Sequence, residues 1–350
     1  MIQMTLFILL VASGTLHLGY ILAALLFYSK NGKDGYSNDL PLIQHIVCFH
    51  NESAFVKRKL ESVYRINYPR IFHTFVNDNS IDDTLALLNQ YKKEHTYIIN
   101  NEENIGKNQS QIKSVKRFDS DLILFTDANV FLEPDSVKEM VRYFDDKTGG
   151  VTGNVTIKTD LDEIEFSGRY WNIEKRIKRF QTIAGSVIGF DGGFYCVKRE
   201  NYKVKRENEL SDFETAFLIF EQQSETKYAK DAKAVEIEKR TLRSSFKARM
   251  RASNRVFWSY YRISKYIRRL KPKVVFHFLF HKLFRYMFLI LLVVNMPAMV
   301  IYLMTHFPWA FLFLLVPAVH RSILESIALF IGGIIALTGK EYITWSDAKS

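Results

Sequence analysis

Residues 42–52 read Leu-Ile-Gln-His-Ile-Val-Cys-Phe-His-Asn-Glu, an apolar run that passes directly into three polar side chains. Its length and composition are typical of a buried strand. Similar apolar runs follow along the chain, separated by segments whose apolar residues recur at helical spacing. This alternation predicts an α/β sheet. The expected strands are Leu42–Phe49, Ile71–Val76, Thr96–Ile99 and Leu122–Phe125, with helices after the first two and near Gln109–Phe118.

Polar side chains follow all four expected strands. The sequences are His50-Asn51-Glu52, Asn77-Asp78-Asn79, Asn100–Asn104 and Asp127-Ala128-Asn129. Ligands of open α/β sheets bind outside the carboxyl ends of the strands, which makes these residues candidates for a binding site. Each of them also suits an ordinary turn or helix cap, where Asn, Asp and Ser are common. Their repetition at four strand ends favours a site.

Several common nucleotide-binding and catalytic motifs do not occur in this sequence. They include G-x-G-x-x-G, G-x-x-x-x-G-K-[ST], H-E-x-x-H and G-x-S-x-G. A bound nucleotide would therefore need its phosphates neutralised in another way. Asp127 and Asn129 place two oxygen ligands on one short turn, and we expect them to hold Mg²⁺ or Mn²⁺ bridging a diphosphate. The alternative is a simple turn leading into a helix.

Two stretches of the 350-residue chain contain no Asp, Glu, Lys or Arg, namely Met1–Tyr28 and Tyr286–His320. Each exceeds the roughly 20 residues that cross a hydrocarbon core, so both are predicted to be embedded in a membrane. The first lacks a basic start and a small-residue cleavage site, which indicates a permanent anchor. Because Lys30 and Lys33 follow it, we expect the next domain to be cytoplasmic.

The net charge of +11 is concentrated in one segment. Of the 48 Lys and Arg residues, 13 lie between Lys239 and Lys273, where no Asp or Glu occurs, so the rest of the chain is close to neutral. Aromatic residues are interspersed among these cations immediately before an apolar stretch. This pattern is typical of an interfacial element on an anionic leaflet. Nucleic-acid binding is disfavoured because no motif for it accompanies the charge.

The two cysteines, Cys48 and Cys196, lie in apolar runs that read as buried strands. No disulfide framework or C-x-x-C metal pattern is present. Cysteine usage therefore agrees with a cytoplasmic location of the domain that follows the first apolar stretch.

The strand-end segments resemble motifs of the family 2 glycosyltransferases with a GT-A fold, in particular the membrane-bound cellulose-synthase-like and poly-N-acetylglucosamine-synthase-like members. The resemblance runs from about Leu42 to Arg285. Residues 47–52 are similar to a strand ending in YNE, 76–84 to vDDgStDgT, 104–107 to the n-x-GK loop, and 125–129 to the D-x-D element in its DAN form. It implies a GT-A domain with a mixed, mostly parallel sheet and flanking transmembrane helices.

Four later segments extend the resemblance. Residues 192–199 are similar to the Gly-rich turn before yaiRR, 246–251 to FRRKVR, and 281–286 to HKLLRW. Ser211 and Asp212 fall where the family has an acidic pair ending in the catalytic Asp. The resemblance thus implies that Asp212 is the general base, with Glu214 the next candidate. The run Ser211–Glu214 also fits a helix capping box, and both roles can hold at once.

The resemblance further implies a set of donor contacts and a metal site. The donor residues are Asn51, Glu52, Asp78, Lys107, Asp127, Gly192, Gly193, Arg249 and Arg251, and the metal ligands are Asp127 and Asn129.

Three departures from the family pattern are visible. Asn77 replaces one Asp of the nucleotide motif, and Ser211 replaces the first acid of the acidic pair. The Q-x-x-R-W motif of processive synthases is missing, and the nearest feature runs from Arg255 to Trp258. These departures leave open whether the chain is processive.

We therefore expect an inverting, membrane-anchored glycosyltransferase that moves a sugar from a nucleotide-diphospho-sugar, expected to be a UDP-sugar, to a growing polysaccharide, glycan or lipid-linked acceptor. Two alternatives remain, a polyprenyl-phosphate sugar synthase and a catalytically inactive membrane scaffold. The expected segments are a transmembrane anchor (1–29), a linker (30–41), the catalytic domain (42–240), a basic interfacial segment (241–283), a transmembrane region of two or three helices (284–339) and a tail (340–350).

Overall fold

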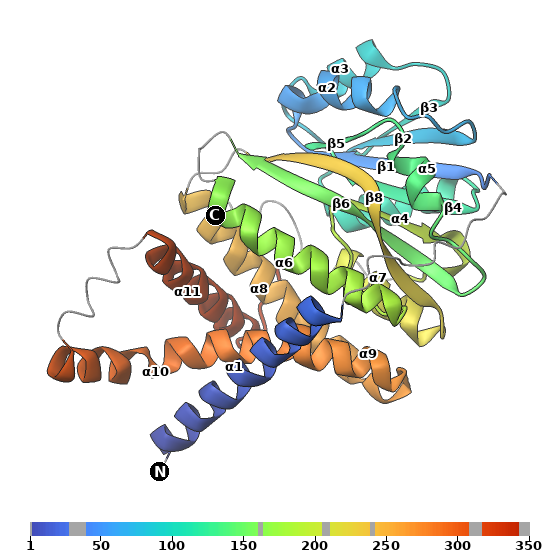
Figure 1. The fold of residues 1–350 in the computed structure, drawn as a ribbon. Helices are drawn as coiled ribbons and strands as arrows, with labels where there is room; N and C mark the ends of the chain where they lie inside the picture. The colour runs from blue at the N-terminus through green and yellow to red at the C-terminus, as the bar shows by residue number, and fades with distance from the viewer. Residues whose placement is uncertain are drawn as a thin grey trace.

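The computed structural model describes residues 2–27, 40–159, 164–204, 211–238, 242–307 and 317–342. An eight-stranded sheet with the order β3-β2-β1-β4-β7-β6-β8-β5 forms its centre (Figure 1). Four strand pairs are parallel and three are antiparallel, which confirms the predicted mixed, mostly parallel sheet. The strands are β1 (Ile43–Phe49), β2 (Ile71–Asn77), β3 (Thr96–Asn100), β4 (Leu122–Asp127), β5 (Val130–Leu132), β6 (Thr148–Thr159), β7 (Phe194–Lys198) and β8 (Glu225–Glu238).

The first four strands lie where the sequence predicts them. Strand β1 is central and pairs in parallel with β2 and β4, so that Cys48 lies opposite both Val76 and Asp127. Strand β3 continues the parallel set beside β2. All four carboxyl ends therefore meet at one edge of the sheet.

Strands β5, β6 and β8 lacked a clear signal in the sequence, whereas β7 contains the apolar run around Cys196 that reads as a buried strand. In β8 the apolar residues alternate with charged ones, and β6 carries three glycines and several threonines instead of a continuous apolar run. Strand β7 pairs antiparallel with β4 and β6, which is where the sheet changes direction. Cys48 and Cys196 lie in β1 and β7 as free thiols, as predicted.

Helices cover both faces of the sheet. Strand residues alternate between the faces, so Ile46 joins a core with α4 and α7, while Val47 joins a core with α2 and α3. Helix α6 lies along β6 and β8. The helices of this region are α2 (Ser53–Val63), α3 (Thr84–Tyr91), α4 (Gly106–Arg117), α5 (Ser136–Val141), α6 (Ile164–Ile183), α7 (Ser211–Glu221) and α8 (Leu242–Ser264).

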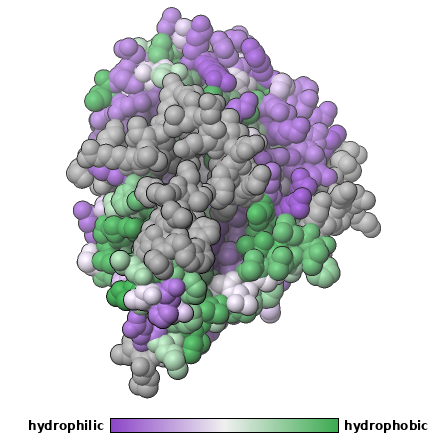
Figure 2. All heavy atoms as spheres, turned by 60° about the vertical axis from the view of Figure 1, so that its left-hand side comes forward, coloured by the Kyte–Doolittle hydropathy of each residue, from purple (hydrophilic) through white to green (hydrophobic). Residues whose placement is uncertain are grey.

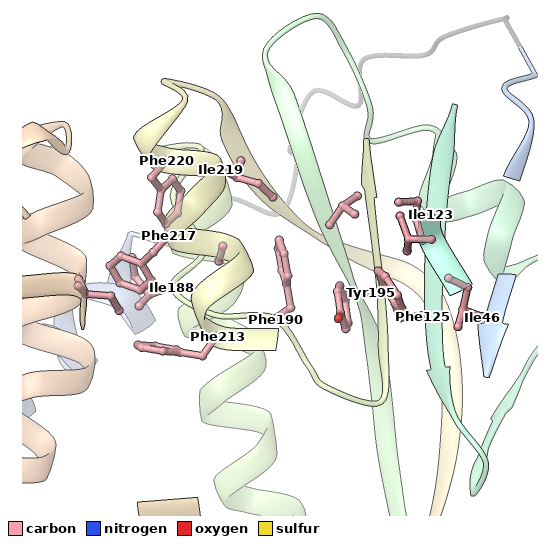
Figure 3. Close-up of a cluster of buried hydrophobic side chains, with 14 of the residues drawn as sticks. Ile46, Ile123, Phe125, Ile188, Phe190, Tyr195, Phe213, Phe217, Ile219 and Phe220 are labelled. Carbon is pink, nitrogen blue, oxygen red and sulfur yellow. The ribbon is translucent and has the colours of Figure 1, made fainter. Parts of the chain in front are cut away.

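A cluster of buried hydrophobic side chains, rich in aromatic rings, joins the sheet to α7 (Figure 3). The rings of Phe125, Tyr195 and Phe190 stack in succession from β4 towards the loop before β7. Phe213 and Phe217 of α7 continue the cluster towards the helices beyond the sheet. Burial of these large side chains fixes α7 firmly against the sheet.

Among the described residues, two helical segments are long and apolar enough to cross a membrane, Gln3–Leu26 and Pro272–His306. The first is α1 (Ile2–Leu26). The second joins α9 (Pro272–His277), a π-helical turn (Phe278–Leu283) and α10 (Phe284–His306). Most of their apolar side chains are not buried in the protein. Figure 2 shows hydrophilic residues gathered over the sheet and hydrophobic residues towards the helical end of the molecule. Lys30 and Lys33 lie outside the described residues.

The two apolar segments are tied to the catalytic region through α6. Glu174 of α6 lies 3.1 Å from His281, 3.0 Å from Lys282 and 3.7 Å from Arg285. Helix α1 adds a hydrogen bond that Gln181 donates to the Tyr20 hydroxyl. The segment that resembles HKLLRW therefore anchors the sheet domain to the apolar helices.

The basic segment forms a partly buried helix. On α8, Ser253, Asn254, Ser259 and Arg262 are buried. Helix α11 (Pro317–Leu337) runs along α8, and α7 also contacts α8. One face of the predicted interfacial segment is thus occupied by protein.

Candidate active site

The polar residues that follow β1, β2, β3 and β4 form one connected network. His50 Nδ1 lies 2.8 Å from the Asp78 carbonyl oxygen, and Asn77 donates to Asn100 at 2.7 Å. Asn104 approaches His50 Nε2 at 3.1 Å. The parallel register of the strands brings these loops together. The juxtaposition expected from the sequence is therefore present.

Asn51 and Glu52 begin the loop between β1 and α2 and hold the neighbouring loop between β2 and α3. The Asn51 amide N–H donates to Ser80 Oγ at 3.0 Å, and the Ile81 N–H donates to Asn51 Oδ1 at 2.8 Å. The Glu52 N–H donates to Thr84 Oγ1 at 3.0 Å. Asn51 adopts φ +55°, a left-handed conformation that Asn tolerates well. These two residues shape the loop that carries Asp78.

Asp78 is almost fully buried and anchors the start of α4. Its carboxylate accepts hydrogen bonds from Asn101 Nδ2 (2.9 Å), the Ile105 N–H (3.0 Å) and the Gly106 N–H (2.8 Å). Gly106 has φ +83°, which a residue with a side chain adopts only at a cost. Asp78 thus fixes the loop that presents Lys107, and its contact with a nucleotide remains a prediction.

Lys107 connects three of the predicted site segments. Its ammonium donates to Asp127 Oδ1 and, at 3.1 Å, to the Gly192 carbonyl oxygen. Burial alone would lower the pKa of Lys107, but the Asp127 carboxylate raises it above the ordinary value. The ammonium is therefore held charged beside the D-x-D-like turn.

Asp212 lies in the first turn of α7, against the Gly-rich turn. A Cβ atom on Gly192 would come within 2.7 Å of Asp212 Oδ2, and one on Gly193 within 2.9 Å of Val130 Cγ2. Glycine at 192 therefore allows the carboxylate to approach the turn closely, and glycine at 193 allows the turn to pack against Val130. The Phe213 N–H donates to Asp212 Oδ1 at 3.0 Å.

The electrostatic setting of Asp212 suits a proton acceptor. Burial raises the pKa of its carboxyl, and the positive charges of Lys107 and Arg255 offset only part of that increase. A carboxylate with a raised pKa takes up a proton more readily than an ordinary aspartate.

Glu214, the other candidate base, is committed to an ion pair. Its carboxylate accepts hydrogen bonds from Arg262 Nε (2.9 Å) and Nη2 (2.6 Å), and both side chains are buried. The guanidinium occupies both oxygens of this carboxylate, which turns them towards α8 and away from an acceptor hydroxyl. The geometry therefore favours Asp212 over Glu214.

The expected metal ligands lie at the end of β4. The Asp127 side chain is about one third exposed, and Asn129 donates through Nδ2 to Glu236 Oε1 (3.3 Å) and the Ile237 carbonyl (3.1 Å). Within the described residues, no group of three or more His, Cys, Asp or Glu side chains could hold a metal ion. Asp127 and Asn129 each carry an oxygen donor, so a cation held there would take its remaining ligands from a diphosphate and water.

Arg249 and Arg251 lie on α8, Arg249 exposed and Arg251 half-buried. Arg255 follows one turn later, and it is this guanidinium whose charge acts on Asp212. The sequence comparison with Q-x-x-R-W pointed to Arg255 without assigning it a role. Its spacing of four residues from Arg251 places both side chains on the same face of a helix, and this spacing could have pointed to Arg255 as a further site residue.

A buried lysine holds the turn formed by residues 127–129 through hydrogen bonds. Lys59 of α2 donates to Thr126 Oγ1 (2.8 Å) and to the Val130 carbonyl (2.5 Å), so it bridges the residues on either side of the turn 127–129. Thr126 Oγ1 is also 2.7 Å from His45 Nε2. The helical pattern of α2 places Lys59 on its buried face, among apolar residues. Burying an amine there would be costly without the hydrogen bonds to Thr126 and Val130.

We expect Lys59 to make stability depend on pH. Burial lowers its pKa from 10.5 to about 7. Between these values the unfolded chain binds the extra proton, so the unfolding free energy should rise with pH by about 1.4 kcal/mol per unit. Denaturation midpoints measured from pH 7 to 10 should show this rise in the wild type and in Lys57→Met, an exposed lysine of the same helix, but not in Lys59→Met. Parallel curves for all three proteins would contradict the assignment.

Comparison with known proteins adds three findings. Residues 45–204 match the model of the family described as glycosyl transferase family 2. The chain is 30% identical over 179 residues to poly-beta-1,6-N-acetyl-D-glucosamine synthase of Staphylococcus aureus (strain COL), covering 49% of this chain and 43% of that protein. The corresponding synthase of Staphylococcus epidermidis is 29% identical over 167 residues, covering 46% of this chain and 40% of that protein. The chain thus spans less than half the length of these relatives.

Among solved structures, the fold is similar to that of the mannosyltransferase PcManGT from Pyrobaculum calidifontis in complex with GDP-Man and Mn²⁺. The TM-score is 0.76, with 17% identity, and the match covers 97% of this chain and 100% of the other. At this identity the likeness concerns the fold alone.

Proposed function

We propose that this chain, whose residues 45–204 form a family 2 glycosyltransferase domain within a GT-A fold, transfers a sugar with inversion from a nucleotide-diphospho-sugar to a glycan acceptor. The observation that carries the proposal is the convergence of Lys107, Asp127, Gly192 and Asp212 at the carboxyl edge of the sheet. The site thus combines a carboxylate that can act as general base, a cation that can stabilise the leaving diphosphate, and a glycine turn that lets other groups approach its backbone. A sugar transfer of this kind requires a base and a cation.

In the proposed reaction Asp212 takes the proton of the acceptor hydroxyl as that oxygen attacks the sugar. The raised pKa of its carboxyl favours this step. Lys107 and Arg255 are cations whose charges act on Asp212, and they would offset the negative charge that develops on the departing diphosphate. Asn51, Glu52 and Asp78 would hold the nucleotide through the loops that they shape, and Arg249 and Arg251 would add positive charge from α8.

Asp127 and Asn129 would hold Mg²⁺ or Mn²⁺, which when bound supplies charge neutralisation for the diphosphate. Support comes from the oxygen atoms that these residues carry and from the Mn²⁺ in the similar mannosyltransferase structure. The exposed part of Asp127 leaves it accessible to a cation arriving with the donor.

The expected donor is a UDP-sugar. The names of the curated relatives support an N-acetylhexosamine donor, whereas the similar solved structure contains GDP-Man. A thermal-shift screen of UDP- and GDP-sugars with and without Mn²⁺ tests donor binding directly. We expect a UDP-sugar to raise the melting temperature more than GDP-mannose does, and only with the cation. Equal shifts by all nucleotides, or none, would contradict the proposed donor site.

We also propose that α1 and the segment Pro272–His306 span a membrane and that the catalytic domain is cytoplasmic. Their length, apolar composition and largely unburied side chains support the membrane assignment, and Lys30 with Lys33 supports the orientation. A reporter inserted beside the exposed Lys147 should be labelled only by cytoplasmic reagents. Labelling from the opposite side would reverse the topology.

A polyprenyl-phosphate acceptor is the second candidate, favoured by the missing Q-x-x-R-W motif and by the basic segment next to an apolar helix. Parallel assays with a polyprenyl phosphate and with a glycan oligomer separate the two functions. We expect product with the glycan. Product only with the lipid phosphate would replace the first candidate by the second.

A further inference from the structure

The chain returns to α8 after α11. Asn254 of α8 donates through Nδ2 to the Lys340 carbonyl at 2.9 Å and accepts the Tyr342 N–H through Oδ1 at 3.1 Å. The Trp258 indole N–H also donates to the Lys340 carbonyl, at 3.3 Å. The first residues of the predicted tail are therefore bound to the helix that carries Arg255.

Glu341 adds a charged link from this segment to α7. Its carboxylate accepts from Arg262 Nη1 at 2.8 Å, while Arg262 binds Glu214 through Nε and Nη2. The three side chains are only 12%, 8% and 4% exposed for Glu341, Arg262 and Glu214, so solvent screens these ion pairs weakly. Glu214 lies two residues after Asp212 on the same helix.

Close packing holds the rest of this assembly together. A Cβ atom on Gly332 of α11 would lie 2.2 Å from the Met250 carbonyl oxygen of α8, so only glycine allows the two helices to come this close. Ser253 donates to the Leu329 carbonyl at 2.6 Å. Figure 1 shows α11 alongside α8. Helix α11 is therefore closely packed against α8, the helix that carries Arg262.

We propose that the backbone of residues 338–342 and the side chain of Glu341 belong to the active-site framework, and that Glu341 is a positioning residue. Through Arg262 and Glu214 it fixes the first turn of α7, and it balances positive charge next to Asp212. The inference rests on the proposed function in one respect, the role of Asp212 as base. Two arginines of α8 face this region, Arg255 and Arg262, against Asp212, Glu214 and Glu341. Without Glu341 the two guanidiniums share fewer carboxylates, and the α7 turn loses a buried anchor.

The test compares Glu341→Gln with Glu341→Asp and Lys340→Gln in the full-length protein. Glu341→Gln keeps the size and removes the charge. Lys340→Gln changes the neighbouring exposed side chain and keeps the carbonyl that α8 binds. We expect Glu341→Gln to lower kcat by about ten- to a hundredfold, because small misplacements of a catalytic group cost that much. The donor KM should stay within about threefold. Glu341→Asp should recover a large part of kcat, and Lys340→Gln should match the wild type.

Backbone hydrogen exchange gives a readout that does not depend on transfer. Amides 211–221 should exchange faster in Glu341→Gln than in Lys340→Gln. If the wild type transfers no sugar, the proposed function fails. The exchange rates would still show whether Glu341 holds the first turn of α7 in place. Unchanged kcat with unchanged exchange in Glu341→Gln overturns the inference. A kcat loss that Lys340→Gln shares, or that Glu341→Asp leaves uncorrected, also overturns it. If Glu341→Gln does not fold, Glu341→Asp takes its place. A rise in its donor KM as large as its fall in kcat would also overturn the inference.

Discussion

Asp212→Asn should lose about 10²- to 10⁴-fold in turnover and keep donor binding. The substitution preserves the size of the side chain and its ability to accept the Phe213 N–H bond, but it removes the basic oxygen that takes the acceptor proton. Because the general base acts only during the chemical step, the loss should appear in kcat and not in UDP affinity. Transfer rates and UDP binding measured on the same purified protein test this.

Asp146→Asn provides a matched control, since Asp146 is an exposed aspartate between α5 and β6. It should behave as the wild type in both measurements. A fall in turnover of less than about tenfold in Asp212→Asn would show that another group takes the proton. A parallel loss of UDP binding would instead make Asp212 a donor ligand.

The raised pKa of Asp212 predicts the acid side of the pH profile. The base must be ionised, so turnover should fall as the pH drops through the pKa of Asp212. Since burial raises that pKa, the fall should occur above the ordinary aspartate value of about 3.9. An acid limb at or below that value, measured as kcat against pH with saturating substrates, would contradict the burial argument.

Asp127→Ala should abolish most of the activity and its dependence on a divalent cation. A metal that neutralises a departing diphosphate contributes several kcal/mol to the transition state, so we expect a loss of about a hundredfold or more. The substitution also frees Lys107 from its partner, and this second effect calls for a readout on the cation itself.

Titration of activity with Mn²⁺ supplies that readout. In Asp127→Ala, activity should no longer respond to Mn²⁺, whereas Asp146→Ala should keep the wild-type response. The wild type should lose its activity in excess chelator and regain it when Mn²⁺ is restored. Full activity of the wild type in excess chelator would contradict metal dependence altogether.

The parallel half of the sheet could be predicted from the sequence because β1, β2 and β4 are largely buried on both faces. Such strands appear as continuous apolar runs, as in Ile43–Phe49, and their polar ends mark the edge where ligands bind. The positions of Asn51, Asp78 and Asp127 at that edge follow from this pattern. The roles of these residues came from the family resemblance.

The antiparallel half of the sheet and the side-chain contacts of the surrounding helices were harder to predict from the sequence. Strand β8 mixes single apolar residues with lysines, an aspartate and glutamates, and it has no continuous apolar run that would mark it as a buried strand. The contact between Glu341 and Arg262 joins residues 79 positions apart, and no local pattern records such a pairing. Lys59 shows the same limit, because its helix predicts an apolar core residue at that position.

The most direct test of the account is sugar transfer by the purified full-length protein. A radiolabelled UDP-sugar and a glycan oligomer are incubated with and without Mn²⁺, and the elongated product is quantified for the wild type and Asp212→Asn. The account predicts product with the wild type only in the presence of the cation, and about 10²- to 10⁴-fold less with Asp212→Asn. A folded wild-type protein that neither transfers nor hydrolyses any nucleotide sugar would contradict it and indicate an inactive scaffold.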